Sequence, residues 1–320
     1  SNFWDNAIQI TKKLKQHYKT PILWGGTHPT VRPVECLEHA DMVCISESEQ
    51  SLVELTRKMT KGQNYTDVKG MGFNVNGKII NNGHGPLPGS KESMFKHLNE
   101  VPHQDYDWES HYVLKNGKVV KMDMETLIAQ SDSYMTMPTR GCPFACTFCV
   151  NSEFLKMYPH QKPIRMRTVD HIIEELNIVK STLPFVKRIL FNDDAFFLMP
   201  LPMIKDFSKK YKEQIGMPLI ITGATPSTLT KTKLSVLADA GLMELRMGIQ
   251  TLAENSKKLY KRPHSNKAIM DSVKVINTEK ERVHAKYDFI LESPWDTDDN
   301  QIETIRFVAQ IPPPFQLNLF

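Results

Sequence analysis

The chain has 320 residues, of which 40% are hydrophobic, 9% aromatic and 24% charged, and its formal net charge is +4. This length suffices for one full domain and part of another. The small positive charge gives no reason to expect a nucleic-acid partner. No apolar run reaches the roughly 18 to 20 residues that cross a bilayer. We therefore expect a cytoplasmic protein that binds neither nucleic acid nor membrane.

Residues 1–82 are predicted to form α/β structure. A strand over 22–24 runs directly into Gly25-Gly26, and a second strand is expected over 40–45, followed by a helix from about Ser46. Glycines after a strand let a ligand approach the backbone closely. His28 is interpreted as a polar loop residue rather than a metal ligand. Ahead of the first strand, helical spacing predicts an apolar face made of Ala7, Ile10 and Leu14.

Residues 83–133 are predicted to be a connector. The run from Asn82 is rich in Gly, Pro and Ser, and a hairpin is expected around Asn116-Gly117. Another hairpin, around Asn76-Gly77, is expected just before the connector.

Residues 134–320 alternate apolar runs typical of strands with amphipathic runs typical of helices, as parallel βα units do. Thr168 is expected to cap the first helix and Leu183-Pro184 to end it. Six strands and the helices between them predict an α/β fold, a partial (β/α)6 TIM-like barrel. The strands are expected over 134–139, 188–192, 219–223, 244–250, 286–291 and 316–320. The apolar helix stripes are Ile172, Ile173, Leu176 and Val179; Leu234 and Leu237; Ile269, Val273 and Ile276; and Ile302, Ile305 and Val308.

Three cysteines lie within eight residues directly after the first of these strands. Cys142, Cys146 and Cys149 form a C-x3-C-x2-C segment, residues 142–149, which we call the cysteine loop. Thiolates are the ligands of 4Fe-4S clusters, and three of them leave one iron open. Structural zinc normally requires a second ligand pair, which is missing nearby. A disulfide is disfavoured by the odd cysteine count and by the absence of a secretory leader.

Polar residues follow the later strands of the predicted barrel. Reactive groups of parallel barrels gather at the carboxyl ends of the strands, so the cysteine loop and these residues are expected at one rim. Each of them could instead be a helix cap or a loop residue that satisfies backbone amides. The candidates are Asn192, Asp193, Asp194, Thr225, Ser227, Gln250, Glu292 and Ser293.

The cysteine spacing, with Phe148 just before the third cysteine, resembles the radical S-adenosylmethionine superfamily. The resemblance implies that the three cysteines hold a 4Fe-4S cluster whose open iron chelates S-adenosylmethionine, and that an electron cleaves the sulfonium to a 5′-deoxyadenosyl radical. It also implies that S-adenosylmethionine is held by Phe148, Asp193, Asp194, Gln250 and Glu292. The family often has a G-x-P-x-E-T turn after the fifth strand, and this chain has residues 292–297, ESPWDT, there.

The order of elements around Gly25-Gly26 resembles the downstream half of the Rossmann-like cobalamin-binding domain that precedes many of these enzymes. The resemblance implies that Gly25, Gly26 and Thr27 lie against the cobalamin. In two respects the chain departs from the pattern. It has residues 46–49, SESE, where the family commonly has GEGE, and it contains no D-x-H-x-x-G run. We expect the chain to be a fragment, truncated in this domain and in the barrel.

The predicted function is therefore a cobalamin-dependent radical S-adenosylmethionine enzyme that transfers a methyl group to an unactivated centre of a small molecule. An electron donor such as flavodoxin or ferredoxin is implied as a partner, and no catalytic residue is assigned. Radical rearrangement or cyclisation is the alternative within the class. Two alternatives belong to other classes of protein. One is an iron-sulfur electron-transfer module, which would need Cys36 or Cys44 as a fourth ligand, and the other is a non-catalytic corrinoid-binding protein.

Overall fold

The computed structural model describes residues 3–130, 132–291 and 293–320. The chain divides into two compact units, each described here by itself. The first unit contains Ser1–Pro102 and Cys149–Gln161, and the second contains His103–Phe148 and Lys162–Phe320. Within the described ranges, no helix is both long and apolar enough to span a membrane.

The first unit is built on a four-stranded sheet in the order β1-β2-β3-β4. β1 and β2 pair in parallel, whereas β3 and β4 form the hairpin predicted at Asn76-Gly77. The strands predicted over 22–24 and 40–45 are confirmed. The strands are β1 (Leu23–Trp24), β2 (Met42–Cys44), β3 (Met71–Val75) and β4 (Lys78–Asn81); the helices are α1 (Trp4–His17), α2 (Thr27–Val31), α3 (Pro33–Leu37), α4 (Glu49–Thr60) and α6 (Asn151–Met157), with a short 3-10 helix at Leu98–Glu100.

The apolar face predicted for α1 is wrong. Ile10 is 60% exposed and Leu14 is 40% exposed, whereas Thr11 is buried. The hydroxyl of Thr11 accepts a hydrogen bond from the indole Nε1 of Trp24, at 2.9 Å. A buried indole N–H needs an acceptor, and this requirement places a polar residue on the inward side of the helix.

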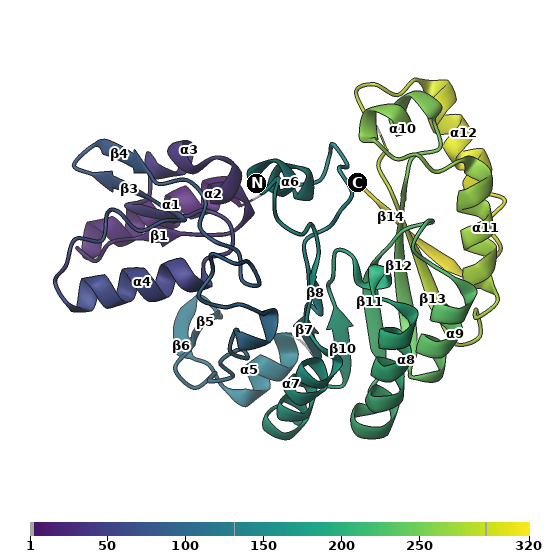
Figure 1. Cartoon of the computed structure of the whole chain (residues 1–320), viewed down its shortest axis with the longest axis horizontal. Helices are drawn as coiled ribbons and strands as arrows, with labels where there is room; N and C mark the ends of the chain where they lie inside the picture. The colour runs from purple at the N-terminus through teal and green to yellow at the C-terminus, as the bar shows by residue number, and fades with distance from the viewer. Residues whose placement is uncertain (1–2, 131, 292) are drawn as a thin grey trace. The chain divides into compact units, whose positions relative to one another are not determined.

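The second unit is built on a six-stranded parallel sheet in the order β14-β13-β12-β11-β10-β7 (Figure 1). All six predicted strands are present, and their bounds differ from the prediction by at most three residues, which confirms the α/β partial barrel. The strands are β7 (Ser133–Thr136), β10 (Arg188–Phe191), β11 (Leu219–Ala224), β12 (Leu242–Gln250), β13 (His284–Phe289) and β14 (Phe315–Leu319). Two small ladders accompany them, β5 (Tyr112–Lys115) with β6 (Lys118–Lys121), which is the predicted hairpin at Asn116-Gly117, and β8 (Thr139–Arg140) with β9 (Arg165–Met166).

The first predicted barrel strand, 134–139, is interrupted before its end. β7 leaves the sheet after Thr136, and Thr139 pairs instead with Met166 in the ladder of β8 and β9. Pro138 stands between them, and proline has no N–H to donate to a strand ladder. The break turns the chain out of the sheet immediately ahead of the cysteine loop.

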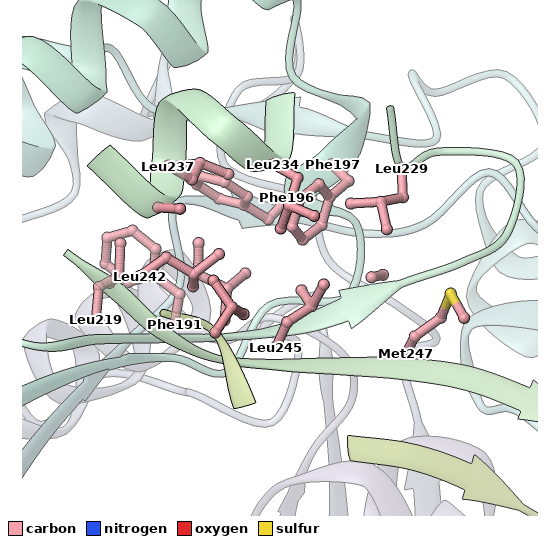
Figure 2. Close-up of a cluster of buried hydrophobic side chains, with 14 of the residues drawn as sticks. Phe191, Phe196, Phe197, Leu219, Leu229, Leu234, Leu237, Leu242, Leu245 and Met247 are labelled. Carbon is pink, nitrogen blue, oxygen red and sulfur yellow. The ribbon is translucent and has the colours of Figure 1, made fainter. Parts of the chain in front are cut away.

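Helices follow the strands and bury the apolar face of the sheet. Figure 2 shows part of this core, in which Leu234 and Leu237 of α9 lie with Phe196, Phe197 and the inward residues of β10, β11 and β12. Three of the four predicted stripes are buried here, but Ile302 and Ile305 of the fourth are exposed and Phe307 is buried in their place. The helices are α5 (Met124–Gln130), α7 (Val169–Thr182), α8 (Leu201–Lys210), α9 (Lys231–Asp239), α10 (Glu254–Tyr260), α11 (Asn266–Asn277) and α12 (Asp298–Val308), with shorter helical turns at Phe196–Leu198 and Tyr211–Ile215. The predicted Thr168 cap and the end at Leu183 are confirmed.

A buried ion pair joins Glu175 of α7 to Arg167, which follows β9, and hydroxyls of the edge strand β7 bind the same carboxylate. Arg167 Nη1 lies 2.6 Å from Glu175 Oε2, and these side chains are 10% and 3% exposed. The hydroxyls of Tyr134 and Thr136 donate to the same carboxylate, at 2.6 and 3.2 Å. The Glu175 carboxylate is thus fully partnered on the side of β7 that faces α7.

Replacing Arg167 by Met should destabilise the protein by about 3 kcal/mol, because removal of one partner leaves a buried carboxylate without its counter-charge. The control is Arg188→Gln, since the ion pair of Arg188 with Asp132 is 41% and 32% exposed and an exposed pair contributes at most about 1 kcal/mol. Urea unfolding of both variants measures the difference. Equal losses would contradict the role given to burial.

The contribution of His171 to the stability of the native state should fall as the pH is lowered from 6.5 to 4. Burial, followed by the charge of Arg167 and by His103, lowers the pKa of His171 to about 4 from 6.5. The unfolded chain therefore binds a proton that the folded chain does not in this interval, and protonation favours unfolding. His171→Gln should reduce the slope of the urea midpoint against pH. An unchanged slope would show that other groups control it.

Candidate functional site

The face of the large sheet that does not carry the apolar core is polar. In β12 the buried residues Leu245, Met247 and Ile249 alternate with partly exposed ones, as the two-residue period of a strand requires. On this second face, Arg246 pairs with Asp288 at 2.7 Å and Glu244 pairs with Lys286 at 2.9 Å. Asn318 of β14 also donates to Asp288, at 2.9 Å. Strand alternation therefore makes this second face of the sheet charged, and its acidic and basic side chains pair with one another.

The start of the cysteine loop is fixed by the carboxylate of Asp193, which follows β10. Its Oδ2 accepts from the backbone N–H of Thr139 at 2.7 Å, and its Oδ1 accepts from the Thr139 hydroxyl at 2.6 Å and from the N–H of Ala195 at 2.8 Å. Asp193 is only 2% exposed. Burial, opposed by these hydrogen bonds, raises the pKa of Asp193 to about 6. Both carboxylate oxygens are thus occupied by the protein's own groups.

Two glycines allow the backbone to pass close to this anchor. Gly141 has φ +85°, and a Cβ there would lie 2.5 Å from the carbonyl oxygen of Pro163. Gly223 of β11 has φ +79°, and a Cβ on it would overlap the carbonyl oxygen of Asp193. Neither position accepts a side chain, since a positive φ and a backbone obstruction coincide. The entry to the loop is therefore a closely packed turn.

The far end of the cysteine loop is held by the C-terminal end of α10. The backbone N–H of Thr147 donates to the carbonyl of Tyr260 at 3.4 Å, and its hydroxyl donates to the carbonyl of Leu259 at 2.8 Å. The ring of Phe148 packs edge-on against Tyr260, with centroids 5.3 Å apart. Sequence reasoning selected Phe148 but missed Thr147 and Tyr260.

The three cysteines are placed differently by the structure. Cys146 is 6% exposed, whereas Cys142 and Cys149 are partly exposed. Cys142 and Cys146 belong to the second unit, and Cys149 opens the segment Cys149–Gln161 of the first. Across the described parts of the chain, no three His, Cys, Asp or Glu side chains are arranged to hold a metal ion. The spacing in the sequence is thus what supports these three as ligands.

The surroundings of Cys146 fit an anionic metal cluster. Arg262 Nη1 donates to Cys146 Sγ at 3.8 Å, and Arg262 is only 6% exposed. The Nε of this arginine is buried without a hydrogen-bond partner in the part of the chain that is described. A buried cation requires negative charge nearby, and a thiolate-bound cluster supplies it. The donor set and its electrostatics are therefore compatible with the group.

Gln250, at the end of β12, has an unusual backbone conformation. Its φ is +76°, in the left-handed region that residues other than glycine avoid. The pairing of β12 with β13 shifts register between Gly248 and Gln250, which marks an irregularity in the ladder. A Cβ on Gly248 would overlap the Gln250 amide. Such a conformation persists only where the surroundings impose it, and such positions cluster at functional sites.

The remaining strand-end candidates have different environments. Asn192 and Asp194 are exposed, and the hydroxyl of Thr222 lies 3.5 Å from Asn192 Oδ1. Thr225 and Ser227 bond to one another at 3.1 Å within a turn that Thr228 closes. Ser293 is 6% exposed, and Glu292 lies outside the described residues.

In the first unit, the Gly25-Gly26 turn borders a cavity of about 690 Å³. Gly26 has φ +97° and precedes α2, a conformation that favours glycine. The His28 ring packs at 4.6 Å from Trp4, and its buried Nε2 has no hydrogen-bond partner within the described residues. The lining is largely apolar, which suits the aromatic part of a ligand. It includes Trp4, Leu23, Trp24, Gly25, Thr27 and His28.

In the turn after β2, Ser46 has a left-handed backbone conformation at a position where the cobalamin-binding domains that this unit resembles commonly have glycine. Ser46 has φ +75°, and its N–H donates to the Thr30 hydroxyl at 2.9 Å. The turn of residues 46–49 therefore persists without glycine. Ser46 bears the strain that glycine would avoid.

A parallel βα sheet with a three-cysteine loop after its first strand defines a class of iron-sulfur enzyme built on a partial TIM-like barrel. The Radical SAM superfamily profile matches residues 136–308, more than half of the chain. The chain belongs to this superfamily, whose cofactors are a 4Fe-4S cluster and S-adenosylmethionine.

Relatives match over nearly the whole chain. An uncharacterised methyltransferase of Pyrococcus horikoshii is 25% identical over 296 residues, covering 91% of this chain and 58% of that protein. The bacteriochlorophyllide d C-8(2)-methyltransferase of Chlorobaculum tepidum is 23% identical over 311 residues, covering 95% of this chain and 60% of that protein. The chain thus spans about 60% of the length of these relatives.

A solved structure shares the fold. The radical S-adenosylmethionine methyltransferase TsrM of Kitasatospora setae, determined with cobalamin and a [4Fe-4S] cluster bound, has a TM-score of 0.72 and 15% identity. The match covers 99% of this chain and 58% of that one.

Removing the Asp193 carboxylate should loosen the cysteine loop. Asp193→Ala leaves two buried N–H groups and a hydroxyl without an acceptor, so we expect a loss of about 3 kcal/mol in unfolding free energy. Asp194→Ala is the matched control, since this neighbouring carboxylate is exposed and its removal should cost at most about 0.5 kcal/mol. Chemical denaturation compares the two. Equal effects would show that Asp193 is not the anchor.

Proposed function

We propose that this chain is the core of a cobalamin-dependent radical S-adenosylmethionine enzyme that transfers a methyl group to an unactivated centre of a small molecule. When bound, the three cofactors would supply reductive cleavage of the sulfonium and a transferable methyl group. The observation that carries the proposal is the cysteine loop, which starts after the first barrel strand and is held at both ends, by Asp193 and by α10.

For the cluster and S-adenosylmethionine, we assign the protein's own groups as follows. Cys142, Cys146 and Cys149 would ligate the cluster and leave one iron for S-adenosylmethionine. Asp193 would act through the backbone that it holds, because Thr139 and Ala195 already occupy its oxygens. The list of groups proposed to contact S-adenosylmethionine is therefore Phe148, Asp194, Gln250 and, by its place after the fifth strand, Glu292.

In the first unit, we propose that residues 1–82 are the downstream part of a cobalamin-binding domain, joined to the barrel at residues 134–320 by the connector 83–133. The support is the cavity beside Gly25, Gly26 and Thr27, whose lining is mostly apolar. Gly26 leaves open space where a side chain would project, so the backbone there can be approached closely.

Methyl transfer is favoured over rearrangement because two relatives that cover more than nine-tenths of the chain are named as methyltransferases. Reductive cleavage requires an electron donor, for which flavodoxin or ferredoxin would serve. We place the enzyme in the cytoplasm, since the partly exposed thiols of Cys142 and Cys149 need a reducing compartment.

Anaerobic reconstitution of the full-length protein with iron and sulfide, followed by dithionite and S-adenosylmethionine, should yield 5′-deoxyadenosine or a demethylated S-adenosylmethionine product. Cys146→Ala should abolish product, because a cluster ligand is lost. The matched control is Cys36→Ala, since Cys36 is fully buried and burial raises the pKa of its thiol to about 11.

A well-folded wild type that binds the cluster but makes neither product would contradict the proposed activity. Loss of the cluster in Cys36→Ala as well would instead favour the electron-transfer module with four cysteine ligands.

A further inference from the structure

We propose that the second face of the large sheet, opposite the apolar core, binds a small molecule that has an apolar body and a carboxylate or phosphate end, and that Arg246 of β12 binds this anionic end. The proposal deepens the function above by naming the chemical class of the substrate. It rests on that function only in taking the bound molecule to be the substrate. Sequence reasoning did not select Arg246.

One half of the second face is apolar. Met135 of β7, Leu190 of β10 and Ile220 of β11 are neighbours across the sheet, because Leu190 pairs in register with both of the others. All three are at least partly exposed, and Met135 is 52% exposed. The adjacent residues Ile189 and Ile221 are buried in the core, so strand alternation places the row on the second face. Ligand sites are lined mainly by apolar side chains, and this row supplies such a lining.

The other half of the second face, on β12 and β13, is charged. Ile220 pairs in register with Glu244, so the apolar row leads directly into this half. The Glu244 carboxylate is bound by Lys286 at 2.9 Å. Nearer the carboxyl ends of the strands, Arg246 Nε lies 2.7 Å from Asp288 Oδ1. A face that changes from apolar to charged within one sheet fits a molecule that is itself amphiphilic.

The terminal nitrogens of Arg246 are available to a ligand. Asp288 accepts only from Nε, at 2.7 and 2.8 Å to its two oxygens. In the ranges that the structure describes, neither Nη1 nor Nη2 donates a hydrogen bond to another residue. The Arg246 side chain is 35% exposed. A guanidinium presents its donors in a planar fork that matches the oxygens of a carboxylate or a phosphate. Arg246 therefore offers the free side of this fork to an anion.

Neighbouring groups hold the guanidinium in place. Asn318 Nδ2 donates to Asp288 Oδ1 at 2.9 Å, which fixes the carboxylate that binds Nε. The Phe320 ring lies with its centroid 5.3 Å from Arg246 Cζ. A group that is already oriented loses little conformational freedom when a ligand binds. Arg246 precedes Gln250 by four residues, about 13 Å along the strand, which favours a second molecule over S-adenosylmethionine as the owner of the anion.

The test measures the binding of octanoate, octyl phosphate and 1-octanol to the full-length protein by isothermal titration calorimetry, before and after cluster reconstitution. The three probes share one alkyl body and differ in the end group. Wild type is compared with Arg246→Gln, Arg246→Lys, Leu190→Ser and Arg188→Gln. Arg188 is the matched control, because it lies on the same face in β10 but its Nη2 is occupied by both oxygens of Asp132, at 2.8 Å.

We expect at least one anionic probe to bind the wild type about tenfold more tightly than 1-octanol, because charge-assisted hydrogen bonds add to the apolar contacts. Arg246→Gln should remove this difference and leave 1-octanol unchanged. Arg246→Lys keeps the charge but lacks the fork, so it should bind the anionic probes more weakly than the wild type. Leu190→Ser should weaken all three probes, and Arg188→Gln none. The preferred anionic probe shows whether the group is a carboxylate or a phosphate.

Equal binding of the three probes by the wild type, or no binding of any, would overturn the proposal. Anionic binding that survives unchanged in both Arg246 variants would overturn it as well. Loss of S-adenosylmethionine binding in Arg246→Gln, with the probes unaffected, would show that Arg246 serves that cofactor instead. If the wild type binds the probes as expected but makes no 5′-deoxyadenosine, the proposed function fails while the anion site stands.

Discussion

The candidate site depends on the hydrogen bonds that the Asp193 carboxylate accepts from Thr139. They join the end of one barrel strand to the residue that leads into the cysteine loop, at 2.6 and 2.7 Å and almost wholly out of water. A carboxylate that is buried and fully hydrogen-bonded has little freedom to move. The loop therefore leaves the sheet at a fixed point and in a fixed direction.

The other contacts of the loop extend the same principle. Thr147 is bound by the end of α10. Cys146 contacts Arg262, which is the second residue after that helix. A short loop with three metal ligands has little core of its own, so its order must come from attachments to rigid elements. Here those elements are the strand ends β10 and β12 and the helix that follows β12.

Much of this arrangement could be predicted from the sequence because it follows from periodicity. The six strands and the buried stripes of α7, α9 and α11 repeat at two or 3.6 residues, and the structure confirms them. Turn chemistry was equally informative at Asn76-Gly77 and Asn116-Gly117, where both asparagines have positive φ. The cysteine spacing led to the superfamily, which the match over residues 136–308 confirms.

The failures share a physical cause, which is that polar contacts between distant residues leave no periodic signal. Thr11 faces inward to accept from Trp24, which displaced the expected apolar face of α1. The contact of Thr147 with Leu259 in the last turn of α10 joins residues 112 positions apart, and that of Cys146 with Arg262 joins residues 116 positions apart. Asp193 was selected as a residue that binds S-adenosylmethionine, which stays a prediction, but its hydrogen bonds to Thr139 and Ala195 were not foreseen. An arginine directly before a proline after the fourth strand was the only hint of Arg262.

The most direct test of the central claim is the Mössbauer spectrum of the anaerobically reconstituted full-length protein, recorded with isotopically labelled iron before and after adding S-adenosylmethionine. Three cysteine ligands leave one iron of the cluster distinct, so we predict that a single iron site changes on addition while the others keep their parameters. A spectrum that does not respond to S-adenosylmethionine, with all irons equivalent, would show a fourth protein ligand and contradict the account.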